Sequence, residues 1–340
     1  MIVTEHLNGD FAIRQSDLVS SLRGRSLKAP ILFLVFNRPE TTRRVFETIR
    51  QAQPPRLYIA ADGPRDDKPD DHATCDTVRE IVSVVDWSCE VRTLFRKKNL
   101  GCSVAVTGAI NWFFEHEAEG IILEDDCLPD RSFFKFCEEL LERYRSEPSV
   151  MMISGGFYLD SQYEIESSYF FSKHVDVWGW AGWRRAWQHN DPKMTLWPNL
   201  RDSDWLKRIG NGHRDFEQFW TEVFDNVRCG RVDTWDYQWV FSCWLQNGLT
   251  VVPSRNLVKN IGFGDDATHT KLDGGRLSKV PLETIPFPLK HPDAIMRDCV
   301  ADRWIDLIVY GIKNVPAYRR FLRKIPGLRQ VVRKMRPFAS

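Results

Sequence analysis

Several features that mark common protein classes are missing from this 340-residue sequence. No apolar run reaches the roughly 18 residues of a membrane-spanning helix, and the N-terminal stretch carries acids where a secretory signal has an apolar block. The eight cysteines include no C-x-x-C pair. Single cysteines inside apolar patterns are typical of a reduced protein. We therefore expect a cytoplasmic globular protein without disulfides.

Two nucleotide-binding motifs are also absent. The first apolar run ends at Phe36, and Asn37-Arg38-Pro39 follows it in place of the G-x-G-x-x-G turn of a dinucleotide-binding fold. The sequence contains no G-x-x-x-x-G-K-[ST] phosphate loop either. Any nucleotide site in this chain must therefore be built in another way.

The balanced charge conceals an asymmetry. The net charge is +1, but residues 307–340 contain nine Lys or Arg and no acid. The first 306 residues therefore carry 38 basic and 46 acidic groups, a net of −8. The chain is an acidic body followed by a basic tail.

The first half of the chain repeats a strand followed by a helix. Residues 30–36 form a continuous apolar run, as in a parallel strand buried on both faces, and helical spacing follows over 41–49. Further strands are expected at 56–61, 89–95, 120–124, 149–154 and 249–253, and helices near 73–85 and 103–116, from 129–130 to about 144, and from 233–236 to Gly248. This alternation predicts an α/β fold, a Rossmann-like, mostly parallel central sheet flanked by helices.

Polar residues follow four consecutive predicted strands. Arg38, Asp62 and Asn99 come after the first three, and the fourth ends in Glu124-Asp125-Asp126. Ligands of open α/β sheets bind at this carboxyl edge, so these residues outline a nucleotide cleft. Adjacent acids repel by on the order of 1–4 kcal/mol per close pair. The triplet therefore predicts a bound cation, and with it a metal and diphosphate site.

The second half is rich in tryptophan. Ten of the thirteen tryptophans lie between Trp178 and Trp244. Core filling accounts for several of them, but flat rings with an N–H donor also suit the face of a sugar. We predict a mixed role, part core and part acceptor platform.

With these residues the chain resembles the GT-A glycosyltransferases, most closely the N-acetylglucosaminyltransferase I type and its bacterial relatives, over roughly residues 30–270. The resemblance implies that Arg38 and Asp62 contact the nucleotide. We also place Asn37, Asn99 and Gly101 in the nucleotide and donor site.

The acidic triplet is similar to the metal-binding D-x-D motif of that family. By this likeness Asp126 is the direct ligand of Mn²⁺ or Mg²⁺, and Glu124 and Asp125 lie nearer the ribose and donor sugar. Such a cation acts as a Lewis acid on the departing diphosphate.

The catalytic base of the family lies at a helix start that matches Trp235-Asp236. Asp236 is thus the expected base, with Asp233 and Asp265 as the next candidates. The segment Trp178-Gly179-Trp180 resembles a family Gly-x-Gly-Trp segment, and residues 262–269, including His269, resemble the loop that closes over the donor.

The expected organisation has four parts. They are an N-terminal extension (1–27), a nucleotide-sugar-binding half (28–156), an acceptor and catalytic half (157–275), and a C-terminal extension with basic amphipathic helices (276–340).

The expected function is inverting, metal-dependent transfer from a UDP-sugar, with UDP-GlcNAc the first donor to try. The acceptor is expected to be a glycan or lipid-linked glycan, and no nucleic acid is expected as a partner. Two alternatives stay open: a sugar nucleotidyltransferase, and a non-catalytic glycan-binding protein.

The basic tail bears on where the protein works. Residues 313–336 place apolar residues three and four apart with Lys and Arg between them, a pattern typical of a helix lying on an anionic membrane. This predicts peripheral contact with the inner face of the membrane. The alternative is that these helices pack on the catalytic domain.

Overall fold

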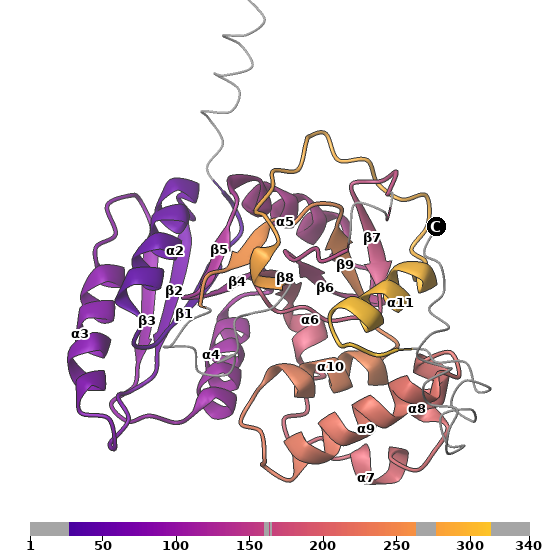
Figure 1. The fold of residues 1–340 in the computed structure, drawn as a ribbon. Helices are drawn as coiled ribbons and strands as arrows, with labels where there is room; N and C mark the ends of the chain where they lie inside the picture. The colour runs from indigo at the N-terminus through magenta and orange to yellow at the C-terminus, as the bar shows by residue number, and fades with distance from the viewer. Residues whose placement is uncertain (1–26, 160–162, 164, 263–276, 314–340) are drawn as a thin grey trace, which may run out of the picture.

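The computed structural model of the chain describes residues 27–159, 163, 165–262 and 277–313 (Figure 1). The predicted N-terminal extension, apart from residue 27, and the basic segment from 314 onward lie outside these residues. Within the described residues, none of the helices is long and apolar enough to cross a membrane. All eight cysteines are free.

The elements alternate between strand and helix through the first half. They are β1 (Ile31–Val35), α2 (Pro39–Ala52), β2 (Arg56–Ala61), α3 (Asp70–Ser83), β3 (Glu90–Phe95), α4 (Cys102–His116), β4 (Glu119–Glu124), β5 (Cys127–Pro129), α5 (Arg131–Arg143) and β6 (Val150–Ser154). The strands and helices that the sequence predicts here are confirmed, with boundaries that shift by a few residues.

The second half is more irregular. Its elements are β7 (Tyr169–Ser172), β8 (Trp180–Trp183), α6 (Arg184–Trp187), α7 (Trp197–Leu200), α8 (Trp205–Ile209), α9 (Arg214–Arg228), α10 (Asp236–Leu245), β9 (Leu249–Pro253), β10 (Val258–Asn260), the 3₁₀ helix η1 (Leu277–Lys279) and α11 (Cys299–Ile308).

The central sheet has eight strands in the order β3-β2-β1-β4-β8-β6-β9-β7. The first four strands are parallel to each other, whereas β8 runs antiparallel to both β4 and β6, and β7 antiparallel to β9. The α/β class is therefore confirmed, and the sheet is mixed, with four parallel strands from the first half of the chain and a further parallel pair, β6 with β9. One sheet runs through both predicted halves.

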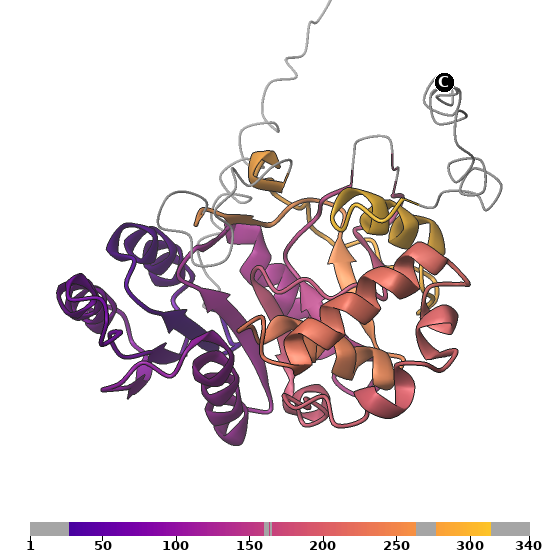
Figure 2. The same ribbon diagram turned by 60° about the horizontal axis from the view of Figure 1, so that its bottom comes forward.

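Helices cover both faces of this sheet because successive strand residues point to opposite sides. In β1, Ile31 and Phe33 pack against α2, α3 and α5, whereas Leu32 and Leu34 pack against α4 and the helices of the second half. Figures 1 and 2 show α2 and α3 beside the parallel strands. In Figure 1, helices α7 to α10 lie below the strands of the second half. The carboxyl ends of β1, β2 and β4 are left between these layers.

The strand β8 comes from the Trp-rich segment and was not expected. Trp180 and Trp183 are buried in it, with 1% and 2% exposure. Trp180 stacks on Trp235 with ring centroids 6.1 Å apart. Most of the tryptophans in this half fill a core in the same way, because aromatic rings bury a large apolar area.

Candidate functional site

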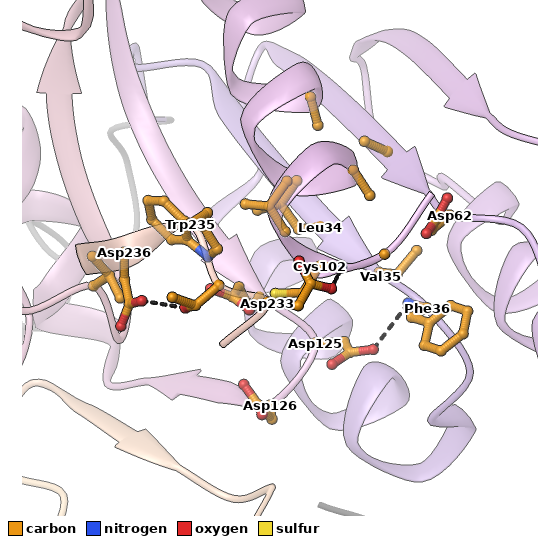
Figure 3. A pocket seen from close by; sticks show the side chains of 18 of the residues that line it. Leu34, Val35, Phe36, Asp62, Cys102, Asp125, Asp126, Asp233, Trp235 and Asp236 are labelled. Atoms are coloured by element: carbon orange, nitrogen blue, oxygen red, sulfur yellow. Dashed lines mark hydrogen bonds between the residues drawn. The ribbon is translucent and has the colours of Figure 1, made fainter. Parts of the chain in front are cut away.

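A cavity of about 620 Å³ opens at the carboxyl ends of β1, β2 and β4 (Figure 3). The first turns of α4 and α10 close its other side, so that residues from both predicted halves line it. Of the predicted site residues, the cavity is lined by Arg38, Asp62, Asn99, Gly101, Glu124, Asp125, Asp126, Trp178, Trp235 and Asp236. The structure thus brings together strand ends and a helix start that lie up to about two hundred residues apart in the sequence.

Three predicted residues lie elsewhere, and two are not described. Asn37 donates to Asp71 Oδ1 at 2.8 Å, behind the cavity wall. Gly179, at φ +68°, precedes β8, and Trp180 lies in that strand within the core. Neither residue lines the cavity, because the family-like segment continues here into a buried strand. His269 and Asp265 fall outside the described residues.

Arg38 bridges the two aspartates of the acidic triplet. Its Nη2 lies 2.8 Å from Asp125 Oδ1, and its Nη1 lies 2.7 Å from Asp126 Oδ2. Arg38 is the N-cap residue of α2, and Pro39 is the first residue of that helix. The fixed backbone of Pro39 therefore positions Arg38 at the end of the loop that follows β1. Burial works against the charge of Arg38, but the charges of Asp125 and Asp126 hold the pKa of this guanidinium above its ordinary value. One cation thus neutralises part of the acidic cluster.

The negative charge of the three carboxylates still exceeds the single positive charge of Arg38. Burial first, and then the charge of Asp126, raises the pKa of Glu124, while burial also raises the pKa of Asp125 despite Arg38. Asp125 is the deeper of the two aspartates, since its Oδ2 accepts the Phe36 N–H at 3.1 Å. The site is therefore short of positive charge, and a further cation or a proton would relieve the repulsion.

Asp62 is held at the far end of the cavity. Its carboxylate accepts the Asn99 side-chain N–H at 3.0 Å and the Leu100 backbone N–H at 3.0 Å. Burial raises its pKa, although the Leu100 N–H works in the other direction. The fixed acceptor beside the cavity can receive an N–H or O–H from a ligand.

Sequence reasoning missed an ion pair on this wall. Arg65 lines the cavity and pairs with Asp71, with Nε 2.6 Å from Asp71 Oδ2. Its guanidinium also lies over the ring of Phe36, 5.4 Å from the centroid. The sequence around Arg65 is a polar stretch after β2, and its composition does not show which of its charges will meet. The pair holds a cation and an aromatic ring on the surface of the cavity.

Asp236 occupies the opposite wall. It is the first residue of α10, and its Oδ1 accepts a short hydrogen bond from Thr234 Oγ1 and the Tyr237 N–H at 2.9 Å. Asp236 also contributes to the electrostatic field at Glu124. A carboxylate therefore faces the acidic triplet across the cavity.

Asp233 has a different position. Its two oxygens accept the backbone N–H groups of Cys102 at 3.0 Å and Ser103 at 3.1 Å, in the first turn of α4. Gly101, with φ +79°, leaves room for it, since a Cβ there would lie 2.9 Å from Asp233 Oδ2. Asp233 thus connects the second half of the chain to helix α4, which lines the cavity.

Trp235 and Trp178 supply aromatic surface. Trp235 is 3% exposed and lines the cavity with its edge, directly before Asp236. Trp178 follows Asp176, whose carboxylate accepts the hydroxyls of Ser154 at 2.9 Å and Tyr158 at 3.1 Å. Both rings are fixed by buried neighbours, so they present a firm apolar surface beside the polar cluster.

The short sheet of β5 and β10 shapes the rim at the acids. Asn260 pairs with Cys127, and the Ile261 N–H donates to the Asp126 carbonyl at 2.7 Å. Gly262 then passes so close that a Cβ there would collide with the Asp126 carboxylate. The chain that leads into the predicted closing loop therefore starts directly over Asp126.

The acidic triplet fits a cation that takes few protein ligands. Both aspartates line the cavity and pair with Arg38, but Asp125 also accepts the Phe36 N–H and is the more buried of the two. Among the described residues, no group of three or more His, Cys, Asp or Glu side chains could hold a metal by itself. Mg²⁺ and similar hard cations bind through one or two carboxylates plus substrate phosphates. Asp126 suits that arrangement.

Comparisons with known proteins find only distant similarity, and only to solved structures. No protein-family model matches the sequence, and no curated protein matches it. Among solved structures, HddC from Yersinia pseudotuberculosis matches with a TM-score of 0.30 and 10% identity, over 46% of this chain and 77% of that chain.

Two further solved structures match at a similar level. A UDP-glucose pyrophosphorylase complexed with UDP-glucose matches with a TM-score of 0.23 and 12% identity, over 40% of this chain and 65% of that one. The inositol-1-phosphate CTP transferase from T. maritima matches with a TM-score of 0.33 and 8% identity, over 68% and 86%. Similarity at this level says nothing about the activity of the present chain.

Proposed function

We propose that the protein is an inverting, metal-dependent glycosyltransferase that uses a UDP-sugar, with UDP-GlcNAc as the first donor to test. The observation that carries the proposal is that Asp236 and the Arg38-bridged aspartates line one cavity from opposite sides. Inversion needs a base and a leaving group on opposite faces of the sugar. The two clusters supply candidates for both tasks.

The nucleotide would lie along the first three strand ends. Asp62, fixed by Asn99 and Leu100, would accept an N–H of the base. Arg65 and Phe36 would flank the nucleoside, and Arg38 would turn part of its donor capacity to the diphosphate. Mn²⁺ or Mg²⁺, held by Asp126 and the phosphates, would supply Lewis-acid stabilisation of the leaving diphosphate.

On the other wall, Asp236 would take the proton from the acceptor hydroxyl as its oxygen attacks the anomeric carbon. The bond from that carbon to the diphosphate oxygen breaks as the new C–O bond forms. Such general-base assistance is typically worth 10²–10⁴-fold in rate. Thr234 and the Tyr237 N–H orient the Asp236 carboxylate, and Trp178 and Trp235 would exclude water and contact the sugars.

The acceptor is proposed to be a glycan or lipid-linked glycan, since the aromatic and carboxylate groups of the second half suit hydroxylated ligands. A sugar nucleotidyltransferase remains the second candidate. The same cavity would then bind a nucleoside triphosphate and a sugar phosphate, and pyrophosphate would be the product.

The decisive experiment separates these reactions by their products. The protein is incubated with Mn²⁺ and a panel of UDP-sugars, and UDP release is followed with and without a pool of glycan acceptors. A parallel assay follows pyrophosphate release from UTP with sugar 1-phosphates. UDP release that needs Asp126 supports the proposal, pyrophosphate release replaces it with the alternative, and the absence of both favours a glycan-binding protein.

A further inference from the structure

Helix α11 carries apolar side chains on its outer face as well as on its inner one. Ala301 and Ile305 are buried beside Asp302 and Asp306, whereas Val300, Trp304 and Leu307 are 57%, 38% and 43% exposed. These three exposed residues are spaced four and three apart, so they lie on one face of the helix. The solvent-facing side of a surface helix normally carries polar residues.

Ion pairs fix the helix in this rotation. Asp306 lies between Lys173 Nζ at 3.0 Å and His174 Nε2 at 3.1 Å, both from the end of β7. Asp302 pairs with Arg297. All these groups except Arg297 are buried, and a buried charge stripped of its partner is costly. The helix therefore cannot roll to hide its apolar stripe without exposing and breaking this network.

The outer face also carries a consistent charge. From Met296, which is 74% exposed, to Leu307, the exposed residues include one cation, Arg303, and no acid. The acid at the helix start, Asp298, is used as the cap, since its Oδ1 accepts the N–H groups of Val300 and Ala301. Directly beyond this face, residues 307–340 contain nine Lys or Arg and no acid.

We propose that the α11 outer face, formed by Val300, Trp304 and Leu307, docks on an anionic membrane surface. Trp is enriched at membrane interfaces, and an apolar helix face flanked by basic residues is the composition of an interfacial helix. Each basic residue near an anionic leaflet adds to the attraction. An acid-free apolar face followed by a strongly basic segment complements anionic lipid better than it complements another acidic or neutral protein surface.

Docking in this way would orient the second half of the domain. Just after α11, Tyr310 packs on His174 and Trp220, with ring centroids 5.4 Å and 5.1 Å apart. Figure 2 shows α11 beside α9, on the second half of the domain and away from α2 and α3. The half that is proposed to hold the acceptor would therefore lie nearest the lipid. The inference does not depend on the proposed reaction.

The first test uses a fluorophore at Cys299, the exposed first residue of α11. The matched control carries it at Cys229, which is also exposed but ends α9; in both proteins the other accessible cysteines are serine. An environment-sensitive nitrobenzoxadiazole label at Cys299 should shift to shorter wavelength with vesicles of phosphatidylcholine and phosphatidylserine. The Cys229 label should not shift. Absence of a shift at Cys299, or equal shifts at both sites, overturns the proposal.

The second test removes the apolar stripe. The V300S/W304S/L307S variant should bind these vesicles at least about tenfold more weakly in a pelleting assay, because three apolar side chains no longer insert. The control V84S/L196S alters exposed apolar residues elsewhere and should bind like the parent protein. Binding of both to phosphatidylcholine alone should be weak.

Other outcomes assign the face differently. Undiminished vesicle binding by the triple variant overturns the proposal. If the Cys299 label shifts on concentrating the protein without lipid, and the triple variant converts a dimer to a monomer in sedimentation, the face packs on a second copy instead. That result also overturns membrane docking.

Discussion

The carboxylate of Asp233 accepts the backbone N–H of Cys102 at 3.0 Å, so a residue of the Trp-rich half caps the first turn of α4. Asp233 stands only three residues before the proposed base Asp236. Sequence reasoning kept both acids as candidates for that role. Both acids line the cavity (Figure 3), but both oxygens of Asp233 accept N–H groups of the α4 terminus, whereas Asp236 lies beside Trp235 at the start of α10.

The first prediction concerns this cap. Asp233→Ala should lower the free energy of unfolding by about 1 kcal/mol, the usual cost of losing a helix cap. Donor KM should rise a few-fold because α4 lines the cavity, while kcat stays within a few-fold of the parent. Asp233→Asn, which keeps an acceptor oxygen, should recover most of the stability. A 10²-fold loss of kcat with unchanged donor binding would instead make Asp233 the base.

The second prediction concerns Asp236. Asp236→Asn keeps the size of the side chain and its hydrogen bond from Thr234, but it cannot accept a proton. We expect kcat to fall by roughly 10²-fold or more with donor affinity little changed. The measurement is donor Kd by titration together with single-turnover rates. Loss of donor binding in this variant would place Asp236 in the nucleotide site.

Thr234 offers a graded companion to that variant. Thr234→Val removes only the short hydrogen bond to Asp236 Oδ1. That bond orients the Asp236 carboxylate, so its loss should lower kcat by less than Asp236→Asn does and leave donor affinity little changed. A loss of donor binding in this variant would instead show that Thr234 supports the nucleotide site.

The third prediction concerns the metal. Because Arg38 already pairs with both Asp125 and Asp126, Mn²⁺ alone should change the Tm very little. Mn²⁺ with UDP should raise the Tm clearly, since the diphosphate completes the ligand set. Asp126→Ala should abolish this joint effect and nearly all turnover while the protein stays folded. A large shift from Mn²⁺ alone, or activity that EDTA leaves unchanged, would contradict it.

Most of the nucleotide half could be predicted from the sequence, for a physical reason. Its strands are buried on both faces and read as unbroken apolar runs, and each is followed by a turn and a helical period. Since parallel strands end at the same edge of a sheet, the sequence alone predicts that Arg38, Asp62 and Asp126 lie close together. All three line the cavity.

The second half could not be read in the same way. Strand β8 is four residues long and inserts between β4 and β6 by pairing with strands far away in the chain. Such pairing leaves no local period, so the sequence placed Trp180 in an acceptor or donor segment by family likeness, whereas the structure buries it in the core. The Asp71–Arg65 pair was missed for a related reason. A polar loop shows its composition but not which of its charges will meet.

The last prediction tests that missed pair through its pH dependence. Arg65, followed by Asn37, holds the pKa of Asp71 at about 2 against the opposing effect of burial. Because this lies below the ordinary value near 3.9, the ionised carboxylate stabilises the fold above that value, and the contribution is lost as pH falls from about 4 to 2.

Asp71→Asn should therefore lower the free energy of unfolding by about 1–3 kcal/mol at pH 7, and the difference from the parent should shrink as the pH falls toward 2. The matched control is Asp70→Asn, whose exposed carboxylate has no hydrogen-bond or ion-pair partner in the described part of the chain. It should stay within about 0.5 kcal/mol of the parent. Denaturant unfolding at several pH values measures both variants. A deficit in Asp71→Asn that stays constant between pH 7 and 3 would show that packing, and not the ion pair with Arg65, is what the substitution disturbs.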